Sequence, residues 1–257
     1  MWLATLISLT VSQVPDAGVW PVSRTVEVTE VVPHRGDAVQ VTMQTVVFSS
    51  EEQERSFTTA VLRLPDGRVT EALEKLNAKL ATLPDLEEVQ HTLADGSWQG
   101  DTGRSIDVVI NRHPFLDVRI CNDVMGSYPW SDCSHARINV VTGEEWSMSQ
   151  AIFAPRRDAF LAECSLRISQ LSREKEDEWI SEGAELDVLR MYGFLPTHCS
   201  EAMLDDAEFA GDVESLTIWS GRGSIHALEP MAWPLTFSRA ELRKWIDPKG
   251  PLGQIVR

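Results

Sequence analysis

The chain has 257 residues and a formal net charge of −16 at pH 7, from 39 acidic and 23 basic side chains. Its 43% hydrophobic content is that of a globular protein and excludes the disordered class, and its length predicts one large domain or two closely packed ones. The negative charge repels nucleic acid and anionic membrane surfaces, so we expect neither as a partner. It either favours a basic partner or simply keeps the protein soluble.

The N-terminal segment indicates export. An apolar run from Trp2 to Val11 is followed by small and turn-forming residues up to Gly18. That is the length of a signal-peptide core and too short for a membrane span, although no Lys or Arg precedes it. We expect residues 1–18 to be a leader and the protein to be periplasmic or extracellular, with no integral membrane segment; a buried N-terminal strand is the alternative.

The first half of the chain predicts strands and one helix. The strands alternate β-branched and polar residues, and we place them at 24–32, 38–48, 57–64, 106–110 and 115–120. The turn at 33–37 joins the first two into a hairpin, and the turn at 111–114 joins the last two. Leucines spaced three and four residues apart predict an amphipathic helix from Val69 to Leu83, ended by Pro84. Residues 95–103 are expected to be a loop.

The central stretch runs from Arg137 to Phe153. It predicts a half-buried strand, a tight turn at Thr142-Gly143 and a short extended piece. A helix follows, with Pro155 at its first position and apolar residues at helical spacing up to Leu171. The charge run at 173–178 is interpreted as a solvated helix end or a linker.

The last part mixes short strands and helical turns. We expect a helical segment at 185–192, strands at 216–219, 224–228 and 235–237, and a final helix that ends at Pro248. Ser238 and Glu241 have the spacing of a capping box at the start of that helix. The predicted fold class is therefore α+β, with antiparallel sheets built from hairpins or a meander and packed with a few amphipathic helices.

Four cysteines agree with export, because an even number in an oxidising compartment indicates disulfides. Four cysteines allow three connectivities. We predict that Cys121 pairs with Cys133, which closes a short loop, and that Cys164 pairs with Cys199. Buried, reduced cysteines are the alternative for a chain that is not exported.

The common catalytic and cofactor motifs are absent from the sequence. It contains no phosphate-binding loop, dinucleotide fingerprint, His-Glu-x-x-His helix or Gly-x-Ser-x-Gly turn. His113, Cys121, Cys133 and His135 match no common zinc spacing, and disulfide formation competes for both thiols. The same competition argues against Cys133 and His135 as a nucleophile and base. We expect no cofactor and no metal.

Two segments carry a family resemblance. Residues 140–153, Val-Val-Thr-Gly-Glu-Glu-Trp-Ser-Met-Ser-Gln-Ala-Ile-Phe, resemble the D-x-x-T-G-K-x-x-x-L-x-D-x-F signature of a bacterial extracellular domain family of largely unknown function. Residues 234–246 are similar to its closing strand and helix. The family is the RsiV-like C-terminal domain, which forms the outer part of lysozyme-sensing anti-sigma factors. Asn139 stands where the family has Asp, and no acidic residue precedes Phe153.

The resemblance implies a domain organisation. After the leader, residues 19–135 would be the companion α+β domain that usually precedes the family's own domain, and residues 136–257 would be the RsiV-like domain; the two are expected to pack as one unit. Residues 126–129 lie where the family has a Gly-Ala-His-Pro-like loop, with Tyr128 in place of His.

We place the candidate binding site in the loop between Cys121 and Cys133, at Gly126, Tyr128, Pro129, Trp130 and Asp132. A bridged loop is pre-organised, and Tyr and Trp provide large contact areas at low entropic cost. The alternative is that Trp130 folds inward and covers the sheet edge. The predicted function is that of a non-enzymatic cell-envelope protein that binds a basic hydrolase such as lysozyme, as the resemblance implies, or a peptidoglycan glycan. The alternatives are an envelope hydrolase whose carboxylate pair the sequence does not locate, and a structural periplasmic protein.

Overall fold

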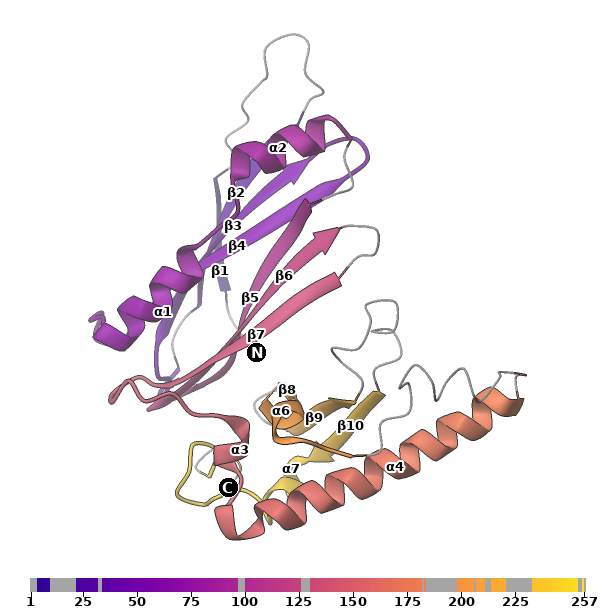
Figure 1. The fold of residues 1–257 in the computed structure, drawn as a ribbon. Coiled ribbons are helices and arrows are strands. Elements are labelled where there is room, and N and C mark those ends of the chain that lie inside the picture. Colours follow the sequence, from indigo (N-terminus) through magenta and orange to yellow (C-terminus); the bar gives the residue numbers. More distant parts are fainter. Residues whose placement is uncertain are drawn as a thin grey trace. The chain divides into compact units, whose positions relative to one another are not determined.

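The structure is a computed structural model, which describes residues 4–9, 22–31, 34–96, 100–125, 130–181, 183, 198–205, 207–210, 214–220, 233–253 and 256. It confirms the α+β class (Figure 1). The chain divides into two compact units, Met1–Glu145 and Trp146–Arg257. The sequence places a boundary after residue 135, whereas the division falls later because the strand that contains this residue runs to Asn139 within the sheet of the first unit. None of the helices in the described ranges is long and apolar enough to cross a membrane.

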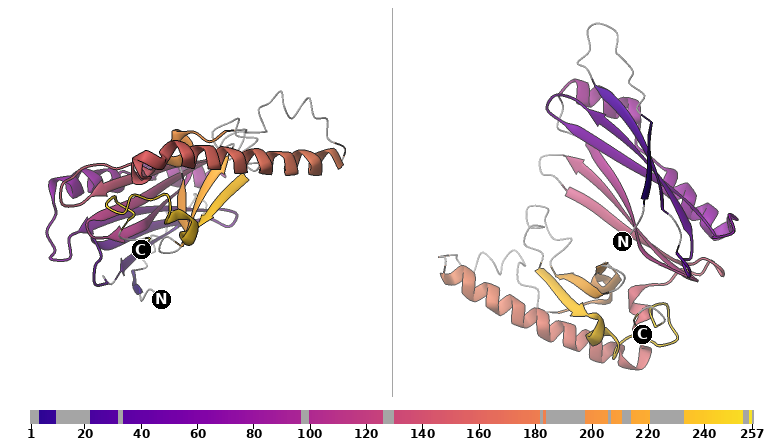
Figure 2. Two further views of the ribbon diagram at one scale, coloured as in Figure 1. Left: turned by 90° about the horizontal axis from the view of Figure 1, so that it is seen from below. Right: turned by 180° about the vertical axis from the view of Figure 1, so that it is seen from behind.

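The first unit is built on a seven-stranded sheet whose strands follow one another in chain order (Figure 2). The strands are β1 (Ala4–Leu9), β2 (Ser23–Val31), β3 (Gln40–Ser49), β4 (Glu54–Arg63), β5 (Gly100–Arg112), β6 (Phe115–Met125) and β7 (Trp130–Asn139). The β2–β3 and β5–β6 hairpins confirm the two hairpins predicted from alternation. Neighbouring strands are antiparallel except β4 and β5, which are parallel.

Within the predicted leader, Ala4–Leu9 forms the edge strand β1. It pairs with β2 from Ala4 opposite Val31 to Leu9 opposite Val26. This pairing corresponds to the alternative interpretation of the N-terminal run, a strand of the sheet. Removal of the leader on export stays a prediction, and it would leave β2 as the edge of the sheet.

Helix α1 (Glu71–Ala81) confirms the predicted leucine-rich helix. Thr70 caps its first turn, because the Thr70 hydroxyl accepts a hydrogen bond from the Leu73 N–H at 3.3 Å. The helix buries Leu73, Leu76 and Leu80 against a core that includes apolar residues of β3 to β7. The apolar spacing in the sequence therefore corresponds to the face that packs on the sheet.

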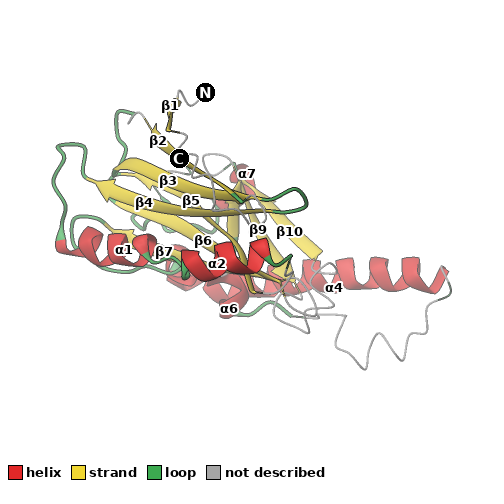
Figure 3. Ribbon diagram, turned by 90° about the horizontal axis from the view of Figure 1, so that it is seen from above, coloured by secondary structure: helices red, strands yellow, loops and turns green. Residues whose placement is uncertain are grey.

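Helix α2 (Leu86–Ala94) is absent from the sequence-based prediction. Asp85 caps it through hydrogen bonds from the N–H groups of Glu87 and Glu88. A nine-residue helix is marginal in isolation, and this one buries Val89 and Leu93 in a second core with residues of β3 and β4. Its stability comes from this tertiary packing, so its local sequence signal is weak. Figure 3 shows both helices running along the sheet.

Two buried arginines on β4 and β5 form hydrogen bonds with the two helices. Arg104 Nη2 donates to the Lys79 carbonyl in the last turn of α1 at 2.9 Å, and Arg55 Nη1 donates to Thr92 Oγ1 of α2 at 2.8 Å. Burial lowers the pKa of both guanidinium groups below their ordinary value. The β4–β5 junction is tight at Gly103, because a Cβ there would lie 3.3 Å from the Ser56 carbonyl oxygen and 3.1 Å from an Asp123 oxygen, so that these neighbours would have to shift by a few tenths of an ångström. Antiparallel pairing with β6 places residues 100–103 in β5, so the loop predicted at 95–103 is shorter than expected.

The second unit contains a three-stranded antiparallel sheet and a long helix. The strand order in this sheet is β10 (Trp233–Ser238), β9 (Ser215–Ser220), β8 (Glu208–Ala210). The helical elements of the second unit are α3 (Met148–Ala151), η1 (Ala154–Arg156), α4 (Arg157–Ser181), α6 (Glu201–Asp205) and α7 (Arg239–Leu242). Helix α4 confirms the predicted helix, although it begins at Arg157 and Pro155 lies in η1 before it. It includes residues 173–178, so the charge run is the helix end and not a linker. Strands β9 and β10 confirm the predicted strands at 216–219 and 235–237 and pair with each other. The segments predicted at 185–192 and 224–228 lie outside the described residues.

An aromatic cluster forms the centre of the second unit. Phe160 of α4 is fully buried, with its ring centroid 5.2 Å from that of Phe237 in β10 and 5.4 Å from that of Trp245. Ser238 and Glu241 form the predicted capping box at the start of α7. That helix ends at Leu242, earlier than predicted, and a turn carries Trp245 and Ile246 to the core.

Glu241 connects α7 to α4. Glu241 Oε1 lies 2.9 Å from Arg167 Nη1, and Glu241 Oε2 accepts a hydrogen bond from the Ser238 N–H at 2.9 Å. The Ser238 hydrogen bonds, and then the Arg167 contact, lower the pKa of this carboxyl from 4.5 to about 2. The ionised form of Glu241 is therefore the form that the fold stabilises.

We expect Glu241→Gln to remove part of the pH dependence of stability, because glutamine keeps the capping acceptor but not the charge. The pKa is lowered in the fold, so the Glu241 contribution is fully present above pH 4.5 and is lost as the pH falls towards 2. The carboxylate is partly exposed, so the difference in unfolding free energy should stay at or below about 1 kcal/mol. Urea unfolding of both proteins across this pH range measures it. A difference that grows towards pH 2 would contradict the assignment.

Candidate functional site

The β6–β7 hairpin carries the predicted binding site. Cys121 of β6 and Cys133 of β7 are directly opposite each other, with Cα atoms 4.0 Å apart, and they form the predicted disulfide bond. The residues between them are mostly strand, which corrects the predicted loop: β6 continues to Met125 and β7 begins at Trp130. The polar residues on both sides of the disulfide give no apolar alternation, so only the cross-strand pairing reveals these strands.

Only part of the predicted site is described by the structure. Gly126, Tyr128 and Pro129 lie outside the described residues. Trp130 pairs with Val124 at the start of β7, and Asp132 is exposed and pairs with Asn122. Beside them, Asp123 accepts a hydrogen bond from the Ser131 hydroxyl. The described end of the hairpin therefore presents carboxylates on both strands.

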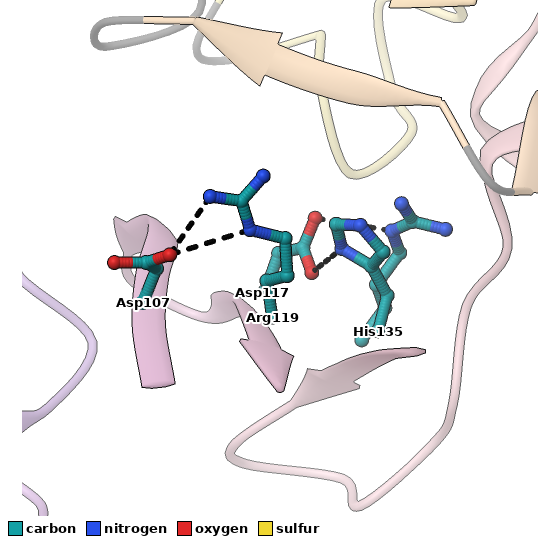
Figure 4. Close-up of polar contacts among 5 residues, drawn as sticks. Asp107, Asp117, Arg119 and His135 are labelled. Atoms are coloured by element: carbon teal, nitrogen blue, oxygen red, sulfur yellow. Dashed lines mark hydrogen bonds and ion pairs between the residues drawn. The ribbon is translucent and has the colours of Figure 1, made fainter. Parts of the chain in front are cut away.

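A buried polar network lies on the same hairpin (Figure 4). Asp117 of β6 has a fully buried side chain, and its two carboxylate oxygens have different partners. Oδ1 lies 2.8 Å from His135 Nδ1, and Oδ2 accepts a hydrogen bond from Arg137 Nε at 3.1 Å. The side chains of His135 and Arg137 are 7% and 5% exposed, so all three groups are removed from water. Because a buried charge is costly without a partner, this arrangement depends on all three residues together.

An exposed ion pair adjoins the network. Arg119, which is opposite His135, binds Asp107 of β5 through Nη2 at 2.8 Å and Nε at 3.3 Å. The Asp107 side chain is 51% exposed, in contrast to Asp117. Figure 4 shows the carboxylates of Asp107 and Asp117 on either side of Arg119. Arg119 is directly opposite Asp107 on β5 and two residues after Asp117 on β6, so the three side chains lie on the same face of the sheet.

The network orients His135, but the nearby Cys133 cannot act as a nucleophile because it is bonded to Cys121. A carboxylate on Nδ1 fixes the imidazole, as it does in many catalytic bases. The cysteine two residues earlier, Cys133, is bonded to Cys121, so its sulfur is not a thiolate. Among the residues that the structure describes, no group of three or more His, Cys, Asp or Glu side chains is arranged to hold a metal ion. The disulfide and the Asp117 contacts therefore cross-link β6 and β7 at two places along the hairpin.

Sequence reasoning missed this network, although a signal was present. In β6, Asp117 and Arg119 alternate with the buried residues Leu116, Val118 and Ile120. In β7, His135 and Arg137 are the matching polar positions. Alternation assigns such residues to the outer face of a half-buried sheet, and it does not show that the part of this face around Asp117 is itself buried.

The second predicted disulfide is not formed in this structure. Cys164 of α4 and Cys199 are both buried and are both free thiols. Sequence spacing and redox compartment do not determine whether two neighbouring sulfurs are bonded.

Two solved structures are similar to the chain along nearly its whole length. A member of the DUF3298 family from Bacteroides fragilis aligns over 99% of this chain and 97% of its own, at 8% identity and a TM-score of 0.43. A DUF3298 family protein from Pseudomonas aeruginosa aligns over 96% and 95%, at 12% identity and a TM-score of 0.39. No protein-family model and no curated protein matches the chain. Similarity this low assigns neither a family nor a function.

Proposed function

We propose that this chain is an exported, non-enzymatic protein of the cell envelope that binds a basic partner through the end of the β6–β7 hairpin. The observation that carries the proposal is the disulfide between Cys121 and Cys133, which joins the two strands that lead into residues 126–129. A segment held at both ends loses less conformational entropy on binding than a free loop. A disulfide also agrees with an oxidising compartment, and so with export.

The charge of the hairpin indicates the chemistry of the partner. Asp123 and Asp132 lie on the two strands on either side of residues 126–129, and the whole chain has a net charge of −16. Such a field accelerates encounter with a basic protein, and added salt weakens the effect. The resemblance of residues 140–153 to the domain family of lysozyme-sensing proteins is the reason to choose lysozyme as the first partner to test. Peptidoglycan fragments are the second.

We expect Trp130→Ala to weaken binding of lysozyme by about 2 kcal/mol or more, because a buried aromatic anchor at an interface contributes on this scale. Asp132→Asn should weaken binding less, and its effect should decrease as salt is added, because Asp132 would act through charge. Calorimetric titration of each variant with lysozyme, and separately with peptidoglycan fragments, measures the affinity and detects any turnover.

Asp158→Asn is the matched control for Asp132→Asn, because Asp158 is an exposed carboxylate on α4 in the other unit. The control should bind as the wild type does. Equal binding by Trp130→Ala would exclude the hairpin as the contact surface. A much lower melting temperature of Trp130→Ala would instead identify Trp130 as a core residue, the alternative stated above.

A further inference from the structure

Two cysteines remain outside the proposed binding site, and both belong to the core of the second unit. Cys164 lies on α4 in line with Phe160 and Ile168, and all three are fully buried. Cys199 precedes α6 and is 7% exposed. Neither sulfur forms a disulfide in this structure.

A hydrogen bond from the Cys199 backbone to Ser165 of α4 places Cys199 near Cys164. The Cys199 N–H donates to Ser165 Oγ at 2.9 Å, so Cys199 is fixed beside α4 next to the residue that follows Cys164. The Cys164 thiol is within hydrogen-bond reach of the Cys199 sulfur, and the Cys199 thiol itself donates to the Ser200 carbonyl oxygen at 3.8 Å. The two sulfurs are therefore neighbours in the core of the second unit.

We propose that Cys164 and Cys199 form a redox-convertible site, at which thiol–disulfide exchange with a small disulfide turns the two thiols into an intramolecular bond. In this site Cys199 is the attacking residue and Cys164 is the resolving residue. The proposal is independent of the partner proposed for the hairpin, because both cysteines lie in the other unit.

The order of attack follows from the surroundings of each sulfur. Cys199 has the greater exposure, and His198 beside it is exposed, so an incoming disulfide reaches this sulfur first. The hydrogen bond from Cys164 lowers the pKa of the Cys199 thiol, whereas donation of that bond, together with burial, raises the pKa of Cys164. Because the thiolate is the nucleophile, Cys199 reacts before Cys164.

The exchange balances without any further reagent. The Cys199 thiolate attacks one sulfur of oxidised glutathione, forms a mixed disulfide and releases one glutathione thiolate, which takes up a proton. The Cys164 thiol then loses its proton and attacks Cys199 Sγ, and the second glutathione leaves. The two cysteines are oxidised, and one oxidised glutathione is reduced to two glutathione thiols.

The test uses the full chain, incubated with oxidised glutathione, alkylated and mapped by mass spectrometry without reduction. Wild type should acquire a Cys164–Cys199 bond and no stable adduct. Cys164→Ser should accumulate one glutathione on Cys199, because the resolving thiol is missing. Cys199→Ser should stay largely unmodified. The Cys121–Cys133 bond is an internal reference that should be present in all three proteins.

Three results would overturn the proposal. They are wild type that keeps both thiols under these conditions, Cys199→Ser that reacts as fast as Cys164→Ser, and a bond from either cysteine to Cys121 or Cys133. Cys164→Ala repeats the trapping experiment with an apolar side chain, so that a packing defect of serine at this buried position does not obscure the result. A higher melting temperature of the oxidised wild type should accompany the bond, since the cross-link restricts the unfolded chain.

Discussion

Asp117→Asn should destabilise the protein by about 3–5 kcal/mol, because it removes one partner of a buried ion pair and leaves the charge of Arg137 facing a neutral amide. The Asp117 side chain is fully buried, and its carboxylate contacts both His135 and Arg137. Asparagine has nearly the same shape, so the change tests charge and hydrogen bonding and leaves the packing volume unchanged. Urea unfolding followed by fluorescence and circular dichroism measures the loss.

Asp107→Asn is the matched control for this experiment. It makes the same chemical change one strand away, at a side chain that is 51% exposed and paired with Arg119. An exposed ion pair contributes less than about 1 kcal/mol, so the control should unfold almost like wild type. Equal losses in the two variants would show that burial of the network does not determine its contribution.

A double variant separates the ion pair from the packing around it. In Asp117→Asn with Arg137→Met, no charge of the pair remains buried, and part of the lost stability should return. If the double variant loses as much unfolding free energy as the two single variants together, Asp117 and Arg137 contribute independently. That result would contradict a role for their direct contact.

Phe160→Ala should cost about 3–5 kcal/mol, the usual range for removal of a fully buried aromatic ring. Phe160 has no exposed surface and contacts the rings of Phe237 and Trp245, so its removal leaves a cavity between α4, β10 and the segment after α7. Thermal and urea unfolding of the variant measure the loss. Because the ring lies in the second unit, signals from that unit should change first.

Leu166→Ala provides the control on the same helix. Leu166 is an apolar residue of α4 that is 53% exposed, and its truncation should change the stability by no more than about 0.5 kcal/mol. A comparable loss in Leu166→Ala would mean that α4 buries a different face from the one that carries Phe160, Cys164 and Ile168.

Much of the fold is predictable from local patterns in the sequence. The alternation in 24–32 and 38–48 shows which side chains share a face of a strand, and those segments form the β2–β3 hairpin. Leucine spacing predicts α1, and the Ser238 and Glu241 spacing predicts the capping box of α7. These signals are reliable because the groups that interact are only a few residues apart in the chain.

The candidate site is less predictable. Sequence spacing suggested the bond between Cys121 and Cys133, which only the cross-strand register of β6 and β7 confirms. The binding role of Trp130 and Asp132 stays a prediction, and Gly126, Tyr128 and Pro129 lie outside the described residues. The neighbouring Asp117 network was not predicted at all.

The tertiary structure alone decided the features that depend on distant segments. Helix α2 packs against side chains of β3 and β4. The parallel contact of β4 with β5 joins two strands that are separated in the sequence by α1 and α2. Asp117 meets Arg137 across two strands, and Ser165 brings Cys199 beside Cys164 from a later part of the chain. A local pattern reports which face of a segment is apolar. Burial of a charge or contact of two thiols depends on what the rest of the chain places against that segment, and only packing determines this.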